Sequence, residues 1–344
     1  MQNITKINKE LKKNFTPKKQ DPSRPVRFWS EKDVLNKKIV NAFVIIFRTR
    51  GCSWAEKNGC TMCGYFNDSM FQKIDEKDLL KQYQRSIDNY NDEEIVKIFT
   101  SGSFLDEKEI PKKVRKHVLK DLSSRCKKIN VETRPEYIKN DVLSDIKKDI
   151  SDTTIELGIG LETADDHIRR KTINKGFNFK DYQKACEKNI KHGFQTKTYL
   201  LVKPPLLSEK KSIDDSIKSV EKVKDFSNTI SFNPVNIQKN TAVEYLWKKN
   251  KYRPPWLYSI IEILKHSKKI AGDIRLQCDI AGGGKNRGAH NCRDCNSYFL
   301  EIISKFSLTQ DLKDLKYKDC ICKEKWLDQL DIEDLSFGSI IDIK

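Results

Sequence analysis

The 344-residue sequence predicts an α/β protein in which six βα units form a partial, TIM-like (β/α)6 barrel, followed by a small cysteine-rich module. The first observation is a series of six short apolar or β-branched runs, each followed by a helical pattern. Successive βα units build a parallel sheet with right-handed crossovers, and six units are too few for a closed eight-stranded barrel. The second observation is a change to glycine- and cysteine-rich sequence after about residue 270.

The predicted strands and helices alternate along the chain. The six strands are expected to begin at Asn41, Glu94, Lys128, Thr153, Lys197 and Thr229. The helices are expected over residues 76–90, 107–126, 135–150, 179–192, 211–226 and 255–269. The polar, basic residues before the first strand are interpreted as an arm because prolines interrupt them. The predicted organisation is an N-terminal arm (1–38), a core barrel (39–270) and a C-terminal module (271–344).

The composition indicates a globular protein of a reducing compartment. Hydrophobic residues make up 37% of the chain, and no run approaches the roughly 20 apolar residues that cross a bilayer. The N-terminus lacks the apolar segment of a secretory signal, so we expect a cytoplasmic protein without membrane contact. Its ten cysteines are then interpreted as metal ligands or buried thiols rather than disulfides. The net charge of +17 favours a nucleic-acid partner, although lysine-rich solvated faces would give the same charge.

Three cysteines follow the first predicted strand in C-x7-C-x2-C spacing: Cys52, Cys60 and Cys63. Three thiolates on an iron-sulfur cube leave one iron open, and that iron can bind the amino and carboxylate groups of S-adenosylmethionine (SAM). A zinc site completed by a fourth ligand, or simply a cysteine-rich loop, is the alternative. This three-cysteine motif, in the loop after the first strand, resembles that of the radical SAM superfamily. The usual spacing in the superfamily, C-x3-C-x2-C, is shorter. The resemblance implies a [4Fe-4S] cluster held by these three cysteines.

Polar and glycine residues at the ends of the next strands are candidates for the SAM site. Ser101, Gly102 and Ser103 lie where the superfamily has a glycine-rich segment against the SAM amino group. Glu132 and Arg134 follow the third strand, and their carboxylate and guanidinium suit the ribose hydroxyls and the SAM carboxylate. Glu162 ends the fourth strand and would bind ribose or methionyl groups. Each residue alone also fits an ordinary turn or surface ion pair, so the prediction depends on their common position at strand ends.

The C-terminal module offers a second metal site. Cys292 and Cys295 form a C-x2-C pair, and Cys320 and Cys322 form a C-x-C pair. Four thiolates suffice for a closed tetrahedral zinc site, and an auxiliary [4Fe-4S] cluster is the second interpretation. Either metal would also accept Cys278 or His290 in place of one cysteine. Free thiols are the remaining alternative.

Several strings together resemble the radical SAM family of archaeosine formation (RaSEA), a more distant relative of the Elp3-like group. They are GSFLD, ETRP, GLET, LVKPP, NPVNIQ, YRPPWL and the cysteine-rich tail, spread over residues 28–326. The resemblance implies a role at position 15 of tRNA. There a partner, archaeosine synthase, attaches lysine to 7-cyano-7-deazaguanine, and the radical protein cleaves the lysine carbon–nitrogen bond. Four residues are expected to contact the substrate near the barrel mouth: Lys203, Asn233, Gln238 and Arg253.

Two other functions remain open at this point. One is a different radical SAM reaction on tRNA, either methylthiolation or Elp3-like carboxymethylation, each of which would use an added domain that the sequence does not display. The other is a non-enzymatic zinc protein that binds nucleic acid, which predicts two zinc sites and no SAM binding.

Overall fold

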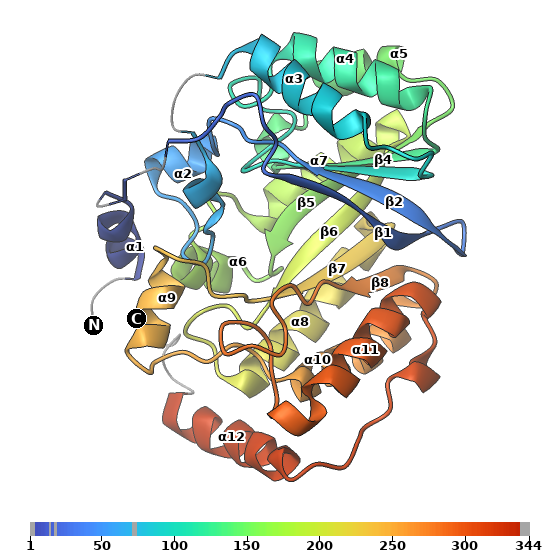
Figure 1. Ribbon diagram of the computed structural model, residues 1–344. Coiled ribbons are helices and arrows are strands. Elements are labelled where there is room, and N and C mark those ends of the chain that lie inside the picture. Colours follow the sequence, from blue (N-terminus) through green and yellow to red (C-terminus); the bar gives the residue numbers. More distant parts are fainter. Residues whose placement is uncertain (1–3, 14, 17–18, 71–73, 338–344) are drawn as a thin grey trace.

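One eight-stranded sheet, curled into a half barrel, forms the centre of the computed structural model (Figure 1). The structure describes residues 4–13, 15–16, 19–70 and 74–337. The strands lie in the sheet in chain order, and every neighbouring pair from β2 to β8 is parallel. The strands are β1 (Arg27–Leu35), β2 (Lys38–Ile46), β3 (Ile95–Phe99), β4 (Lys128–Thr133), β5 (Thr154–Glu162), β6 (Gln195–Val202), β7 (Thr229–Pro234) and β8 (Arg275–Cys278). The predicted α/β half barrel is therefore confirmed.

Two strands lie outside the predicted six. Strand β1 pairs antiparallel with β2 through a tight turn in which Asn36 and Lys37 both have positive φ angles, 50° and 62°. The interpretation of residues 1–38 as an arm is wrong over β1, and also over α1 (Ile4–Lys13). Strand β8 has only four residues and extends the sheet into the range assigned to the C-terminal module. Charged residues that point into the barrel hide the apolar alternation of β1, and β8 is too short to show any.

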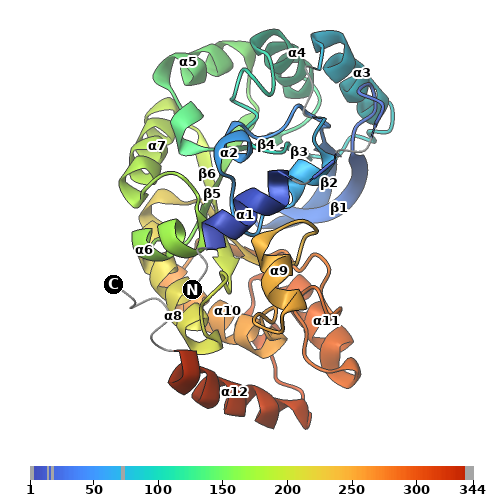
Figure 2. The ribbon, with the colours of Figure 1, turned by 90° about the vertical axis from the view of Figure 1, so that its left-hand side faces the viewer.

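Helices cover the convex face of the sheet, as Figures 1 and 2 show from two sides. Helix α7 occupies the predicted range, because Asn178 and Asp181 form a capping box at its start and Gly193 ends it with a φ of 76°. The helix predicted from residue 107 begins only after Pro111, and the one predicted from 135 is interrupted after a short turn of 3-10 helix. The helices along the chain after α1 are α2 (Ser53–Lys57), α3 (Glu76–Ile87), α4 (Lys112–Ser123), α5 (Asn140–Asp149), α6 (Asp166–Ile168), α7 (Phe179–His192), α8 (Glu209–Val223), α9 (Ala242–Lys248), α10 (Leu257–Ala271), α11 (Arg293–Thr309) and α12 (Cys322–Phe337).

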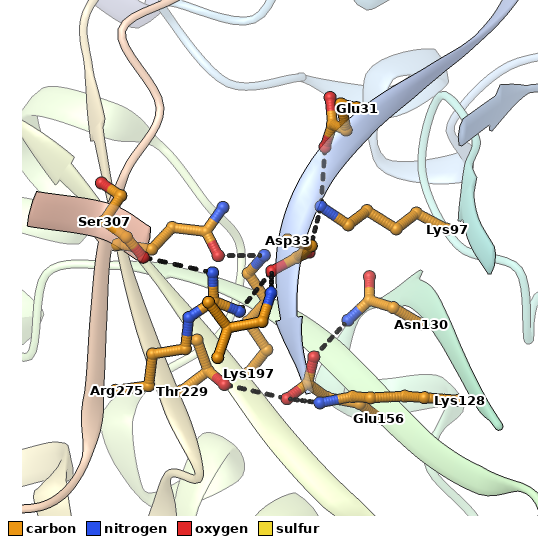
Figure 3. A network of polar contacts seen from close by, with 12 residues as sticks. Glu31, Asp33, Lys97, Lys128, Asn130, Glu156, Lys197, Thr229, Arg275 and Ser307 are labelled. Carbon is orange, nitrogen blue, oxygen red and sulfur yellow. Dashed lines mark hydrogen bonds and ion pairs between the residues drawn. The ribbon is translucent and has the colours of Figure 1, made fainter. Parts of the chain in front are cut away.

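The concave interior of the half barrel holds a buried network of charged side chains (Figure 3). Asp33 of β1 pairs with Lys97 of β3 and, at 2.5 Å, with Arg275 of β8, so it connects the two edge strands of the sheet. On the neighbouring strands, Glu156 accepts a hydrogen bond from Lys128 at 2.8 Å. A buried charge is tolerated when it is paired and hydrogen-bonded, as the Asp33–Lys97 and Glu156–Lys128 pairs are. The network therefore fixes β1 against β8 below the open mouth of the barrel.

We predict that Asp33→Ala destabilises the fold by about 3–5 kcal/mol, because it leaves Lys97 and Arg275 buried without their counter-charge. Burial alone would raise the pKa of Asp33, but Lys97 and Arg275 outweigh burial and hold this pKa well below 3.8. The stabilisation is thus present above the pKa of the unfolded state and is lost as the pH falls below it. Urea unfolding at pH 7 and at about pH 2, below the pKa of the unfolded state, measures both effects. The control is Asp21→Ala, whose exposed ion pairs contribute little; an equal loss in both variants would contradict the prediction.

Candidate active site

A cavity of about 240 Å³ opens at the carboxyl ends of the strands. All three cysteines of the C-x7-C-x2-C loop line it. It is also lined by residues that follow β3, β4, β5 and β7, which places groups far apart in the sequence around one space. Of the expected site residues, the cavity is lined by Cys52, Cys60, Cys63, Ser101, Gly102, Glu132, Arg134, Glu162, Asn233 and Gln238.

The cysteine loop is fastened to the barrel by its own polar groups. Trp54 donates its indole N–H to the carbonyl of Asn174 at 2.8 Å, and the Thr61 hydroxyl donates to Thr172 at 2.6 Å. Burial raises the pKa of the Cys52 thiol, and burial and then the neighbouring Cys60 raise the pKa of Cys63 to about 12. Such thiols stay protonated at neutral pH without a cation, so a metal that binds them must displace their protons.

The segment after β3 is shaped by a buried carboxylate. Glu109 accepts hydrogen bonds from the backbone N–H groups of Ser101 at 2.8 Å and Ser103 at 2.7 Å, and also from that of Gly102. Because these N–H groups are bonded to Glu109, a ligand next to the segment would contact the backbone carbonyl groups of the segment rather than its N–H groups. A Cβ atom at Gly102 would lie 2.9 Å from the Cys52 sulfur, so only glycine permits this approach. The Ser103 side chain does not line the cavity and instead contacts the Thr133 hydroxyl at 2.8 Å.

Charged groups after β4 and β5 form the wall next to the cysteines. Glu162 has a φ of 71°, a strained angle for a residue with a side chain, and its carboxylate pairs with Lys175 at 2.6 Å. The guanidinium of Arg134 donates to Glu136 at 2.6 Å and to the Lys175 carbonyl at 3.0 Å. Burial raises the pKa of Glu132 to about 7, against the opposing effect of Lys197. This wall offers both signs of charge to a zwitterionic ligand.

Two of the four expected substrate contacts lie elsewhere. Lys203 is buried in an ion pair with Glu209 at 2.6 Å and points away from the cavity. Arg253 stacks on Trp256 at 3.7 Å and donates to the His290 carbonyl, beside a different groove. Neither side chain lines the cavity, because a position after a strand or a helix does not fix where the side chain points. Asn233 and Gln238 do line the cavity.

The cavity also contains residues that the sequence reasoning missed: Tyr65, Lys175, Tyr199 and Asp279. Tyr199 lies two residues after Lys197 on β6, and the period of two along a strand would have marked both as inward-facing. Asp279 directly follows β8, a strand that was not predicted. Lys175 lies in an irregular segment, and no sequence signal connected it with Glu162.

The four C-terminal cysteines come together as a second cluster. The Sγ–Sγ distances are 3.6 Å for Cys292–Cys295, 3.4 Å for Cys292–Cys320, 3.5 Å for Cys295–Cys322 and 3.5 Å for Cys320–Cys322. Burial opposes ionisation of Cys292, but hydrogen bonds from the other three thiols lower its pKa to about 7. The group of four does not include Cys278, a buried residue of β8, or His290, whose Nδ1 contacts the Gly288 carbonyl at 2.8 Å.

Comparison with known proteins agrees with this geometry. Residues 46–211 match the model of the radical SAM superfamily. The half barrel, with its cysteine loop at the strand ends, defines the chain as a radical SAM enzyme. It is 40% identical to archaeosine synthase subunit beta of Methanosarcina acetivorans over 98% of this chain and 99% of that one, and 34% identical to the Thermococcus kodakarensis protein of the same name over 87% and 94%. The chain belongs to this family of archaeosine synthase beta subunits.

Among solved structures, the chain is similar to Elp3 of Methanocaldococcus infernus with an N-terminal deletion. The identity is 16%, the match covers 67% of this chain and 58% of that one, and the TM-score is 0.47. Among the described helices, none has the length and apolar character to cross a membrane.

The family implies a [4Fe-4S] cluster and SAM, and the residues present fit both groups. Three thiols line one cavity, and a glycine stands where a Cβ would press against a cysteine sulfur. Carboxylates and a guanidinium lie on the adjoining wall. The cavity is thus able to hold a cluster with an open iron beside a zwitterionic ligand.

Proposed function

We propose that Cys52, Cys60 and Cys63 bind the [4Fe-4S] cluster and that SAM binds at its open iron. The observation that carries this proposal is that the three cysteines line the same cavity as the strand-end groups after β3, β4 and β5. When bound, the cluster supplies one electron to SAM, whose cleavage yields methionine and a 5′-deoxyadenosyl radical.

The protein's own groups would hold SAM in place from three sides. The carbonyl side of Ser101 and Gly102 would accept hydrogen bonds from the SAM amino group. Arg134 would bind the SAM carboxylate as a fork-shaped cation. Glu132 and Glu162 would accept hydrogen bonds from the ribose hydroxyls, and Lys175 holds Glu162 in position at 2.6 Å.

In the reaction we propose, the 5′-deoxyadenosyl radical takes a hydrogen atom from the lysine side chain of the adduct of 7-cyano-7-deazaguanine at tRNA position 15. The lysine carbon–nitrogen bond then breaks, and the lysine carbon chain leaves as an alkene. The nitrogen stays on the base and becomes the formamidine of archaeosine after it gains one electron from the reductant and one proton. The names of the relatives, the basic charge of the chain and the open mouth of the cavity support this proposal. Asn233 and Gln238 are the proposed substrate contacts, since both line the cavity on the side of β7.

We further propose two partners, tRNA and an archaeosine synthase subunit that makes the adduct, in the cytoplasm. The relatives are named subunit beta, which implies a second subunit in those proteins. The net charge of +17 would favour the approach of a polyanionic tRNA.

The four C-terminal cysteines are proposed to bind structural zinc. Four sulfurs around one ion with Zn–S bonds of about 2.3 Å are about 3.8 Å apart in a regular tetrahedron. Four of the six Sγ–Sγ distances are 3.4–3.6 Å, and all six are within 4.8 Å, so they are close to that value. In a [4Fe-4S] cube each cysteine binds a different iron, so the cysteine sulfurs are further apart than around a single zinc ion. The geometry therefore supports zinc over an auxiliary cluster.

The experiment that tests the function uses the anaerobically reconstituted protein, SAM, a one-electron reductant and tRNA that carries the lysine adduct. We expect archaeosine in the tRNA and 5′-deoxyadenosine, both dependent on SAM. Formation of 5′-deoxyadenosine with unchanged adduct would contradict the proposed substrate and favour another tRNA reaction. Zinc as the only bound metal, with no 5′-deoxyadenosine, would favour a nucleic-acid-binding protein.

A further inference from the structure

Helix α1 lies between α2 and α9, beside the cysteine loop, in both ribbon views (Figures 1 and 2). Asn8 connects α1 to the cysteine loop. This residue is fully buried, although it belongs to a helix that is mostly polar. The Asn8 amide donates to the carbonyl of Cys60 at 3.3 Å and to that of Asn58 at 3.4 Å. Its oxygen accepts a hydrogen bond from the backbone N–H of Ala242 at 3.3 Å. One side chain thus ties the cysteine loop to the first turn of α9.

Lys12, one helical turn further along α1, makes the second contact. Its ammonium is buried, lies 4.8 Å from the centre of the Phe66 ring, and has no hydrogen-bond acceptor within the described residues. A Cβ atom at Gly59 would lie 1.7 Å from this ammonium, so the glycine next to Cys60 leaves the space that the charge occupies. A cation in such a position needs negative charge nearby to be stable.

Negative charge bound by the cysteine loop would explain why the Lys12 ammonium is buried beside it. The Lys12 ammonium lies beside Gly59, which directly precedes Cys60 in the three-cysteine loop. Its positive charge acts on whatever the cysteines bind. A cluster held by three thiolates carries more negative charge after it accepts an electron, so a nearby cation stabilises the reduced form and raises the reduction potential.

We propose that Asn8 and Lys12 are positioning residues of the active site: Asn8 holds the cysteine loop in its ligand-binding conformation, and the Lys12 ammonium makes the bound cluster easier to reduce. Helix α1 is then part of the redox centre, although it supplies no ligand. This inference rests on the proposed binding of the cluster by the three cysteines.

The test of Lys12 is a redox titration of the SAM-free cluster followed by electron paramagnetic resonance. In Lys12→Met we expect the ratio of reduced to oxidised cluster at a fixed potential to fall about threefold to tenfold; tenfold corresponds to 59 mV for one electron. Lys13→Met is the matched control, because Lys13 is the next residue of α1 and is exposed. A titration curve for Lys12→Met that coincides with wild type and the control would overturn the proposed role of Lys12.

The test of Asn8 does not need the cluster. Hydrogen exchange of the metal-free protein, followed by mass spectrometry, should be faster in Asn8→Ala for the peptide that covers residues 52–64, with the strands unchanged. Unchanged exchange there would overturn the role of Asn8. If wild type takes up no cluster while Asn8→Ala still loosens the loop, the proposed function fails and the positioning role of Asn8 is retained.

Discussion

Replacement of Cys63 by alanine is expected to abolish cluster binding and the formation of 5′-deoxyadenosine. Two remaining thiolates would not hold the cube with a single open iron. Because Cys63 would be a direct ligand, the loss of cluster binding and activity should be larger than the roughly 10–100-fold loss that is typical when a residue supporting a ligand is changed. Iron content, the visible absorption of the cluster and a 5′-deoxyadenosine assay after anaerobic reconstitution measure it.

The matched control is Cys186→Ala, because Cys186 is a fully buried thiol of α7 that does not line the cavity. This variant should bind iron and cleave SAM like the wild type. Cys52→Ala and Cys60→Ala should behave like Cys63→Ala. Normal SAM cleavage by all three variants would refute the proposed cluster ligands.

Replacement of Cys295 by alanine is expected to remove one zinc ion per chain and to lower the melting temperature strongly. Structural zinc sites have apparent binding free energies of about 10–16 kcal/mol, and here the metal would join α11 to the start of α12. The decrease in the free energy of unfolding should therefore exceed the roughly 2–5 kcal/mol that is typical of a truncated core side chain. Metal analysis and thermal unfolding measure the two effects.

Cys278→Ala provides the control for this second site. Cys278 is buried in β8, and its change should cost only packing and leave the zinc content unchanged. Loss of zinc from Cys278→Ala would show that the ligand set differs from the four clustered cysteines. If the wild type contains additional iron and sulfide that are lost in Cys295→Ala, the four cysteines bind an auxiliary iron-sulfur cluster instead of zinc.

Those parts of the fold and site that depend on local sequence could be predicted. The strands β2 to β7 are short runs rich in apolar and β-branched residues, and the cysteine loop is a single segment with its own spacing. Parallel strands bring their carboxyl ends to one edge, so Glu132 and Glu162 were predicted to lie together without knowledge of any contact. Side-chain direction could not be predicted in this way. Lys203 and Arg253 also follow strands or helices, yet they point toward Glu209 and Trp256.

The order of the βα units, the three-cysteine loop and the two cysteine pairs near the C-terminus can be recognised from the sequence, because each depends on the character and spacing of nearby residues. Contacts between residues far apart in the chain become visible only in the folded structure. It joined β1 to β8 through Asp33 and Arg275, paired Lys175 with Glu162, and placed Asn8 against the carbonyl of Cys60. A charged strand or helix looks like a solvated segment until its partners are known, since the energy that buries a charge comes from its distant counter-charge.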